Sequence, residues 1–552
     1  MSHSLGLTSI FAILPLVVLF VLLGVVRLKA HWASLITLAV AILVALIVYS
    51  MPFGQAGDSA LEGMAFGFWP IMWIVLNALW IYNMTDATGH FAVLRHAFSA
   101  VSDDLRVQVV MIAFCFGALL EALAGFGTPP AICSVMLVGL GLSPIRAVAV
   151  ALVADTAPVA FGAIAIPITT LGEVTGLPTQ HLSEMVGRQT PFLALMIPFV
   201  LVFMIDGRRG LRESWPAALM AGLTFAVLQF AVSNYVSMQL TDIVASLGSA
   251  GTLVMFLRVW HPTAPSATAA TAPRPGAAIA GGSTSDAAFE RTVRSRSGSD
   301  HDGPPPTGRD MILAFAPYAI IVVILGAMSL DAVTKWLDDA TTAFSWPGLH
   351  VLGHTGKAPT SETFKLNWFT AAGTGLLASG IVTAIVLRVS PLRAARIYGQ
   401  TLNQIKWALL TVCTVLGIAY VMNMSGQTIT LGTWAAGAGG FFAFLSPIIG
   451  WFGTAVTGSD TSTNSLFGAL QVAAAKQSGL SPTLLAAANS SGGVLAKMVS
   501  PQNLAIGAAA VGLGGREGDI FRKVLGWSVV LVLIMAVIVL LQSTSVLSWM
   551  VP

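Results

Sequence analysis

Long apolar runs separated by short polar segments recur along the whole chain. Examples lie at residues 10–26, 35–49, 215–232 and 524–541. Each is long enough, or nearly so, to cross a hydrocarbon core of about 30 Å as a helix. Only 9% of the 552 residues are charged, whereas soluble domains carry about 25%. The pattern predicts an all-α polytopic membrane protein with about 14 membrane elements.

Clusters of Lys and Arg alternate with acidic or mixed loops, and such clusters are typical of the cytoplasmic side. They are Arg27 with Lys29, Arg95 with Arg106, residues 208–212, residues 388–406 and residues 516–523. The alternation predicts an N-terminus outside the cell. Residues 261–309 are rich in Ala, Thr, Ser, Pro and Arg, which predicts a disordered cytoplasmic linker. It would join transmembrane halves at 1–260 and 310–552, and a regulatory role for it stays open.

Two stretches of the chain resemble each other. Phe-Gly-Thr at 126–128 is followed by Gly-Leu-Ser-Pro at 141–144, and the same two motifs recur at 452–454 and 479–482. The spacing is 12 residues longer in the second copy, with the extra residues around 458–464. The copies, at about 107–171 and 433–515, lie between loops of opposite predicted side. We therefore expect an inverted-topology repeat with a substrate near the membrane midplane.

Both copies place Gly and Pro at membrane depth, where irregular backbone survives only inside protein or beside a wet cavity. Residues 125–130 and 453–464 are therefore predicted to be helix breaks or re-entrant tips, with Gly450 a further candidate. The free N–H groups of a broken helix suit an anion. The alternative is that these glycines only let helices pack closely.

Polar side chains gather in the second copy. Six consecutive polar residues occupy 459–464, and further amides, hydroxyls and Lys497 follow at 489–503. An ordinary aqueous loop is the alternative for 459–464. A cation at membrane depth is costly and is commonly matched to an anion. The predicted substrate-binding residues are Gly125, Gly127, Thr128, Ser459, Asp460, Thr461, Ser462, Asn464, Asn489, Ser490, Lys497, Gln502 and Asn503.

Three acids, Glu121, Asp155 and Asp460, lie in apolar surroundings. Burial favours the protonated form of a carboxyl group, so each is a candidate proton carrier. Each could instead be a fixed ion-pair partner of Lys497 or Arg146.

Signatures of other function classes are missing from the sequence. There is no P-loop, no H-E-x-x-H and no G-x-S-x-G motif, and the three cysteines have no metal-ligand spacing. We expect no cofactor, no metal, no nucleic-acid partner and no enzymatic activity. The pattern favours a secondary transporter of a small carboxylate, while a channel stays open as a rival.

The motifs at 120–130, 154–158, 457–464, 489–493 and 497–503 resemble those of the bacterial lactate permease family over essentially the whole chain. The resemblance implies proton-coupled uptake of 2-hydroxy monocarboxylates, lactate and glycolate, across the inner membrane. It also implies an elevator-type motion of paired hairpins. A sodium-coupled carboxylate or dicarboxylate transporter is the alternative, and a homo-oligomer stays open.

Overall fold

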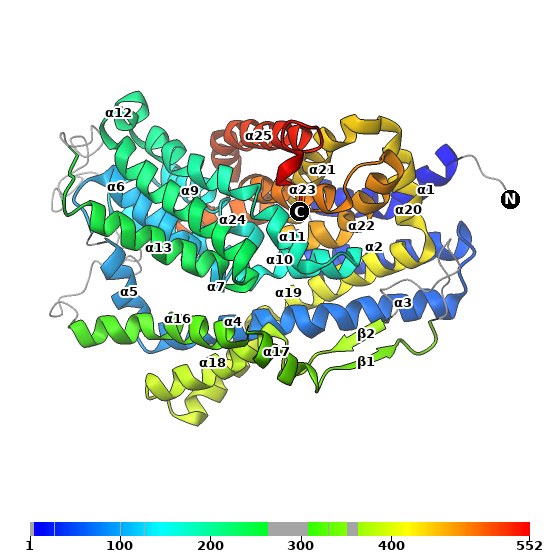
Figure 1. Ribbon diagram of the computed structural model, residues 1–552, viewed down its shortest axis with the longest axis horizontal. Coiled ribbons are helices and arrows are strands. Elements are labelled where there is room, and N and C mark those ends of the chain that lie inside the picture. The colour runs from blue at the N-terminus through cyan, green and yellow to red at the C-terminus, as the bar shows by residue number, and fades with distance from the viewer. Residues whose placement is uncertain are drawn as a thin grey trace.

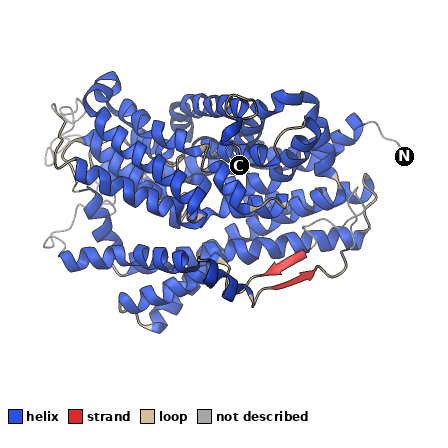
Figure 2. Ribbon diagram, viewed as in Figure 1, coloured by secondary structure: helices blue, strands red, loops and turns tan. Residues whose placement is uncertain are grey.

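The computed structural model describes residues 5–26, 28–99, 101–125, 127–262, 307–328, 330–349 and 363–552. Most of the predicted linker, together with Arg27, therefore lies outside the described residues. Helices make up nearly all of the structure, as Figure 2 shows, and a single two-stranded hairpin is the exception in the described ranges. The prediction of a helical membrane protein is confirmed. The hairpin, β1 (Thr342–Ser345) paired antiparallel with β2 (Thr363–Leu366), was not predicted.

Nine helical segments in the described ranges are long and apolar enough to cross a membrane. They are Ala30–Ile47, Phe53–Ala87, Leu105–Leu123, Thr179–Tyr235, Met238–Phe256, Gly308–Met328, Pro391–Ser425, Gln427–Thr457 and Glu517–Gln542. A bent pair, Pro144–Ala154 with Val159–Thr175, would make a tenth span, broken by 65°. The chain is thus a multi-pass membrane protein, while the predicted total of about 14 membrane elements stays a prediction.

One row of helices runs below the rest of the molecule in Figure 1, and its members pack on one another. Tryptophan side chains bind this row together, since Trp73 Nε1 donates to Thr374 Oγ1 at 3.1 Å and Trp80 Nε1 donates to the Ala394 carbonyl at 3.0 Å. Its helices are α3 (Phe53–Phe66), α4 (Trp73–Ala87), α16 (Gly308–Met328), α17 (Asp331–Asp338), α18 (Ala372–Val386) and α19 (Pro391–Ser425).

Most of the remaining helices form a second, thicker layer. Those of the N-terminal half are α1 (Leu5–Phe20), α2 (Ala30–Ile47), α6 (Leu105–Val109), α7 (Gly117–Leu123), α8 (Thr128–Gly139), α9 (Pro144–Ala154), α10 (Gly162–Thr175), α11 (Thr179–Val186), α12 (Thr190–Tyr235) and α13 (Thr241–Phe256). Those of the C-terminal half are α20 (Gln427–Ala435), α21 (Phe442–Thr457), α22 (Asp460–Ser478), α23 (Pro482–Gly493), α24 (Pro501–Ala510) and α25 (Glu517–Gln542). Helix α5 (His90–Ser99) lies between the two layers and packs on α16 and α4.

The two similar stretches share one order of elements. In the first, α7, a glycine break, α8, the Gly-Leu-Ser-Pro turn, α9, the 3-10 turn η4 (Val159–Phe161) and α10 follow one another. In the second, α21, Gly458, α22, the same turn, α23, the 3-10 turn η8 (Val494–Val499) and α24 do so. The shared order is consistent with a repeat. Their opposite senses in the membrane stay a prediction.

The structure corrects the extent of the second break. Gly450 and Gly453 lie inside α21, and only Gly458, with φ +74°, interrupts the backbone. A Cβ on Gly453 would lie 2.7 Å from the Thr463 methyl group, so these two glycines serve close packing, which was the alternative interpretation. Part of the extra length of this copy lies in α22, which has 19 residues where α8 has 12. The polar run from Asp460 onward is therefore helix, and the aqueous-loop interpretation is wrong.

Candidate functional site

The first break is a stretch of left-handed backbone between α7 and α8. Gly125 and Gly127 have φ values of +51° and +82°, a region that glycine adopts without steric cost. Residues 163–165, at the start of α10, are left-handed too although none is glycine, at a cost of roughly 1–2 kcal/mol each. A Cβ on Gly125 would lie 3.3 Å from the Ala163 Cβ. Two irregular backbone segments therefore meet beside the end of α7.

The second break faces the start of α24, as the first does. Asn503 Nδ2 donates a 3.2 Å hydrogen bond to the Gly458 carbonyl. A Cβ on Gly127 would lie 3.2 Å from Asn503 Oδ1. A Cβ on Gly458 would lie 2.8 Å from Gln502 Oε1. The structure thus brings both predicted breaks to one place, with Asn503 in contact with each of them.

A charged group lies beside these breaks, and we call Glu121, Asp155 and Lys497 the lysine cluster. Lys497 Nζ lies 2.6 Å from Glu121 Oε1 and 3.1 Å from Asp155 Oδ2. The side chains of Lys497, Glu121 and Asp155 are only 7%, 5% and 2% exposed. Glu121 comes from α7, Asp155 from the end of α9 and Lys497 from η8. Two carboxyl groups of the first copy therefore share one cation of the second.

Two of the three acids, Glu121 and Asp155, pair with Lys497, as the ion-pair alternative expected, and their role as proton carriers stays a prediction. Arg146 is exposed in the first turns of α9 and makes no ion pair within the described residues, so its candidacy as a partner is wrong. A Cβ on Gly162 would lie 2.7 Å from Glu121 Oε1. The glycine at the start of α10 thus leaves the space that the Glu121 carboxyl group occupies.

The third acid, Asp460, is held by neutral donors, and we call Asp460, Asn464, Asn489 and Ser490 the amide cluster. Asp460 Oδ2 accepts from Ser490 Oγ at 2.5 Å and from Asn464 Nδ2 at 3.4 Å. Asn489 Nδ2 donates to Asn464 Oδ1 at 2.9 Å. All four side chains are buried. The other oxygen, Asp460 Oδ1, has no hydrogen-bond partner in the described residues, so it could accept one from a ligand.

The other predicted residues flank these two clusters. Ser459 is the N-cap of α22 and accepts a 3.3 Å hydrogen bond from the Ser462 amide. Ser462 is buried in the first turn of that helix, and Thr461 is half-buried. Thr128 is half-buried at the start of α8, whereas Gln502 is exposed. Gln502 is thus the most exposed of these flanking residues.

Sequence reasoning missed a further buried acid, Asp242, in the first turn of α13. Gln229 Nε2 donates to Asp242 Oδ1 at 3.1 Å, and Asp242 Oδ2 has no hydrogen-bond partner in the described residues. The Asp242 carboxyl group is close enough to Glu121 to interact with its charge. The described residues contain no group of three His, Cys, Asp or Glu arranged to hold a metal.

Comparison with known proteins gives matches over almost the full length. The profile of the L-lactate permease family matches residues 8–546. The glycolate permease GlcA of Escherichia coli strain K12 is 39% identical over 562 residues, which cover 98% of this chain and 96% of that protein. The L-lactate permease of Bacillus subtilis strain 168 is 38% identical over 568 residues, which cover 100% and 98%.

Solved structures give weaker matches. The YdaH transporter of Alcanivorax borkumensis matches with a TM-score of 0.43 and 15% identity, covering 87% of this chain and 86% of that one. The antimetabolite efflux pump MtrF of Neisseria gonorrhoeae matches with a TM-score of 0.43 and 13% identity, covering 98% and 95%.

Proposed function

This chain belongs to the L-lactate permease family, and we propose that it carries lactate and glycolate into the cell together with protons. Its relatives are permeases, so the protein is a transporter and not an enzyme. We take the substrates from the names of those relatives. The proton is our inference from the charges at the centre of the molecule.

The lysine cluster is the observation that carries this proposal. Its three buried side chains hold one positive charge and up to two negative charges. Buried charges are stable only when they are paired, and two close carboxyl groups oppose each other's ionisation. A carboxylate substrate would add one more negative charge to the site. Binding of a proton by Glu121 or Asp155 would offset that charge.

The proposed coupling is an exchange of partners at Lys497. In the described conformation its ammonium group is occupied by Glu121 and Asp155. A proton that enters one of these carboxyl groups weakens its bond to Lys497. The ammonium group can then donate to the carboxylate of lactate, since a charge-assisted hydrogen bond favours an ionised acceptor. The anion and the proton would thus bind together and leave together.

The neutral groups around the lysine cluster would fix the rest of the substrate. We assign the 2-hydroxyl group to the amide cluster, whose Asp460 Oδ1 has no hydrogen-bond partner in the described ranges. The N–H groups at Gly125, Gly127 and Thr128 would assist in holding the carboxylate. Asn503 contacts both breaks, so a movement of this residue would alter the backbone positions of both breaks together. Asp460 stays a third candidate for the proton.

The placement in the cell forms part of the same proposal. We place the protein in the bacterial inner membrane, with the N-terminus outside and residues 261–309 in the cytoplasm. The two halves would be inverted relative to each other, and the breaks with their hairpins would move as an elevator. Alternation of basic clusters with acidic loops supports the orientation.

Uptake of radiolabelled L-lactate and glycolate into proteoliposomes tests the function. An inward proton gradient imposed by a pH step should drive accumulation that saturates with substrate concentration. Exposed Lys476, on α22, offers a matched control, because Lys476→Met should preserve uptake that Lys497→Met removes.

An imposed sodium gradient, at equal pH on both sides, is the second arm. Accumulation driven by sodium alone, with no response to the pH step, would replace the proton proposal with the sodium alternative. Uptake that does not saturate would favour a channel. Transport of neither acid would contradict the assigned substrates.

A further inference from the structure

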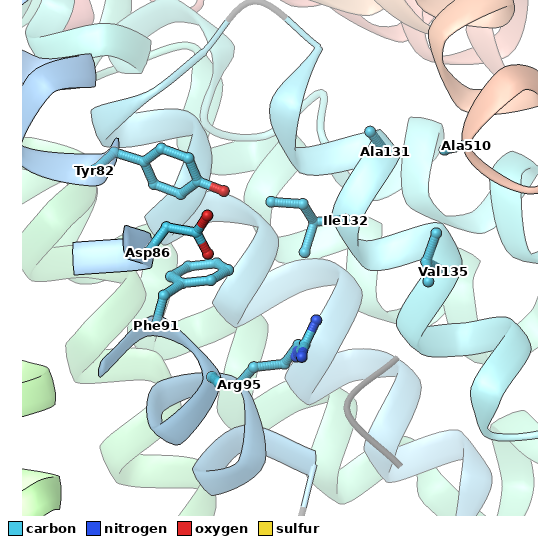
Figure 3. Close-up of a pocket in the computed structure, with 9 residues that line it drawn as sticks. Tyr82, Asp86, Phe91, Arg95, Ala131, Ile132, Val135 and Ala510 are labelled. Carbon is cyan, nitrogen blue, oxygen red and sulfur yellow. The ribbon is translucent and has the colours of Figure 1, made fainter. Parts of the chain in front are cut away.

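A pocket of 280 Å³ lies between α4 and α5 on one side and α8 and the end of α24 on the other. Its size is that of roughly nine water molecules, which is enough for a molecule with a few heavy atoms. None of the residues that the sequence marked as a site lines it. Figure 3 shows the polar ends of Tyr82, Asp86 and Arg95 directed toward the space in front of α8.

The two walls of the pocket differ in chemistry. One wall offers the Tyr82 hydroxyl group, the Arg95 guanidinium group and the carboxyl group of the exposed Asp86. The opposite wall is apolar and includes Ala131, Ile132 and Val135 of α8 together with Ala510 of α24. A cation, a hydroxyl group and an apolar surface match the three parts of lactate, which are its carboxylate, its hydroxyl group and its methyl group.

Arg95 is the group that would recognise an anion. The nearby Asp86 carboxylate acts on its guanidinium group through charge, although Asp86 and Arg95 form no ion pair with each other among the described residues. Burial lowers the pKa of Arg95 from its ordinary value, so an anionic partner stabilises its charged form. Arginine binds carboxylates through two parallel hydrogen bonds. A substrate carboxylate that enters the pocket could therefore bind the Arg95 guanidinium group in this way.

The pocket and the lysine cluster are connected through α8. This helix supplies Ala131, Ile132 and Val135 to the pocket and packs against α7 and α9. Glu121 lies on α7, and Asp155 follows the last residue of α9. The N-cap of α8 is Gly127, whose left-handed backbone belongs to the first break, and a change of backbone angles there would shift the helix.

We propose that this pocket is a second carboxylate-binding site on the path of release, in which Arg95 holds the substrate's carboxylate and Tyr82 its hydroxyl group. The inference rests on the proposed function for the identity of the ligand. Arg95 belongs to a basic cluster that predicts the cytoplasmic side, so the site would receive the anion as it leaves the lysine cluster.

Protection of an introduced cysteine by L-lactate tests the site. Ile132→Cys places a thiol in the pocket wall, and Val138→Cys is the control, because it is equally half-buried on α8 but does not line the pocket. The three native cysteines are buried, so the full-length protein serves as the background. Saturating L-lactate should slow alkylation by a maleimide at position 132 and leave position 138 unchanged.

Arg95→Gln in the Ile132→Cys protein should raise the lactate concentration needed for protection about tenfold, the loss expected for a hydrogen bond to a charged group. Arg95→Lys should retain part of the protection, and Tyr82→Phe should weaken it less. If the glutamine variant does not fold, the lysine and phenylalanine variants decide the question. A membrane-impermeant maleimide should reach position 132 in inside-out vesicles.

Failure of this inference is separable from failure of the proposed function. If the Ile132→Cys protein accumulates lactate but lactate never protects the thiol, the pocket is not a substrate site although the function stands. Equal protection at 138, or protection that survives Arg95→Gln unchanged, would also overturn it. Labelling from the outer face alone would contradict the release path. A folded protein that transports no lactate would instead refute the proposed function.

Discussion

The lysine cluster and the amide cluster both stabilise buried carboxyl groups, but they do so through different interactions. Each buries carboxyl groups at the centre of a membrane protein, where water cannot solvate them. Glu121 and Asp155 share the ammonium group of Lys497, whereas Asp460 accepts hydrogen bonds from Ser490 and Asn464. A proton that binds Glu121 or Asp155 weakens that group's hold on the Lys497 cation, whereas the donors around Asp460 carry no charge that protonation could release. The comparison assigns coupling to the first cluster and positioning to the second.

The two clusters also differ in how they use the two copies. Asp155 ends α9 and Gly493 ends α23, while Val159 begins η4 and Lys497 lies in η8. The copies thus carry different chemistry at matching places. Close packing explains the glycine at position 493, because a Cβ there would lie 2.8 Å from Thr454 Oγ1 and would crowd Asp460 Oδ1. The absence of a side chain at 493 leaves room for the amide cluster.

The largest effect should follow from Lys497→Met. It leaves two buried carboxyl groups without their cation, and breaking a buried ion pair in this way costs about 3–5 kcal/mol. We expect uptake to fall to the level of empty vesicles and thermal unfolding in detergent to begin at a lower temperature. Lys476→Met should change neither. Normal uptake by a stable Lys497→Met protein would remove the lysine cluster from the mechanism.

An intermediate effect should follow from Glu121→Gln and Asp155→Asn, which remove one negative charge each and preserve shape. Accumulation driven by a pH step should fall by about a hundredfold or more at the acid that carries the proton, the contribution typical of a positioned proton-transfer group. Lactate exchange across the membrane at equal pH should persist, because it needs no net proton movement. The exposed Asp103→Asn is the matched control. Equal accumulation by both variants and wild type would exclude both acids.

The smallest effect should follow from Asp460→Asn. An amide oxygen can still accept from Ser490, so the structure should survive with a loss of about 0.5–1.5 kcal/mol, typical of one hydrogen bond. The substrate concentration at half-maximal uptake should rise while the response to the pH step is retained. Asp460→Ala should raise that concentration further. Loss of the pH response in a folded Asp460→Asn protein would move the proton to the amide cluster and reverse the comparison.

Much of the architecture could be predicted because it depends on local composition. Apolar runs indicate helices that need lipid around them, and glycine at membrane depth indicates a break, as Gly125, Gly127 and Gly458 prove to be. The prediction of helix breaks was wrong at glycines that serve helix packing, because a glycine can either interrupt a helix or let two helices approach closely. Gly450 and Gly453 permit close packing inside α21, and their positions along the chain do not distinguish that role from a break.

The sequence alone could not predict which groups pair with the buried charges. Glu121, Asp155, Asp460 and Lys497 are all visible as charges in apolar surroundings, but an acid can pair with any cation that the fold brings near. Lys497 and Glu121 are 376 positions apart in the chain. Asp242 was missed for the same reason, since only the packing of α13 against α7 brings it near Glu121.

The sequence by itself therefore determined the class of the protein, the stretches where helices break and the stock of charged and amide groups within the membrane layer. These follow from the cost of placing each residue type in lipid, which is a local property. Only the tertiary structure decided that Lys497 serves two acids of the other copy while Asp460 depends on neutral donors. Most of those pairings depend on distances of 2.5–3.1 Å between segments remote in sequence, which hydrophobic patterning does not encode.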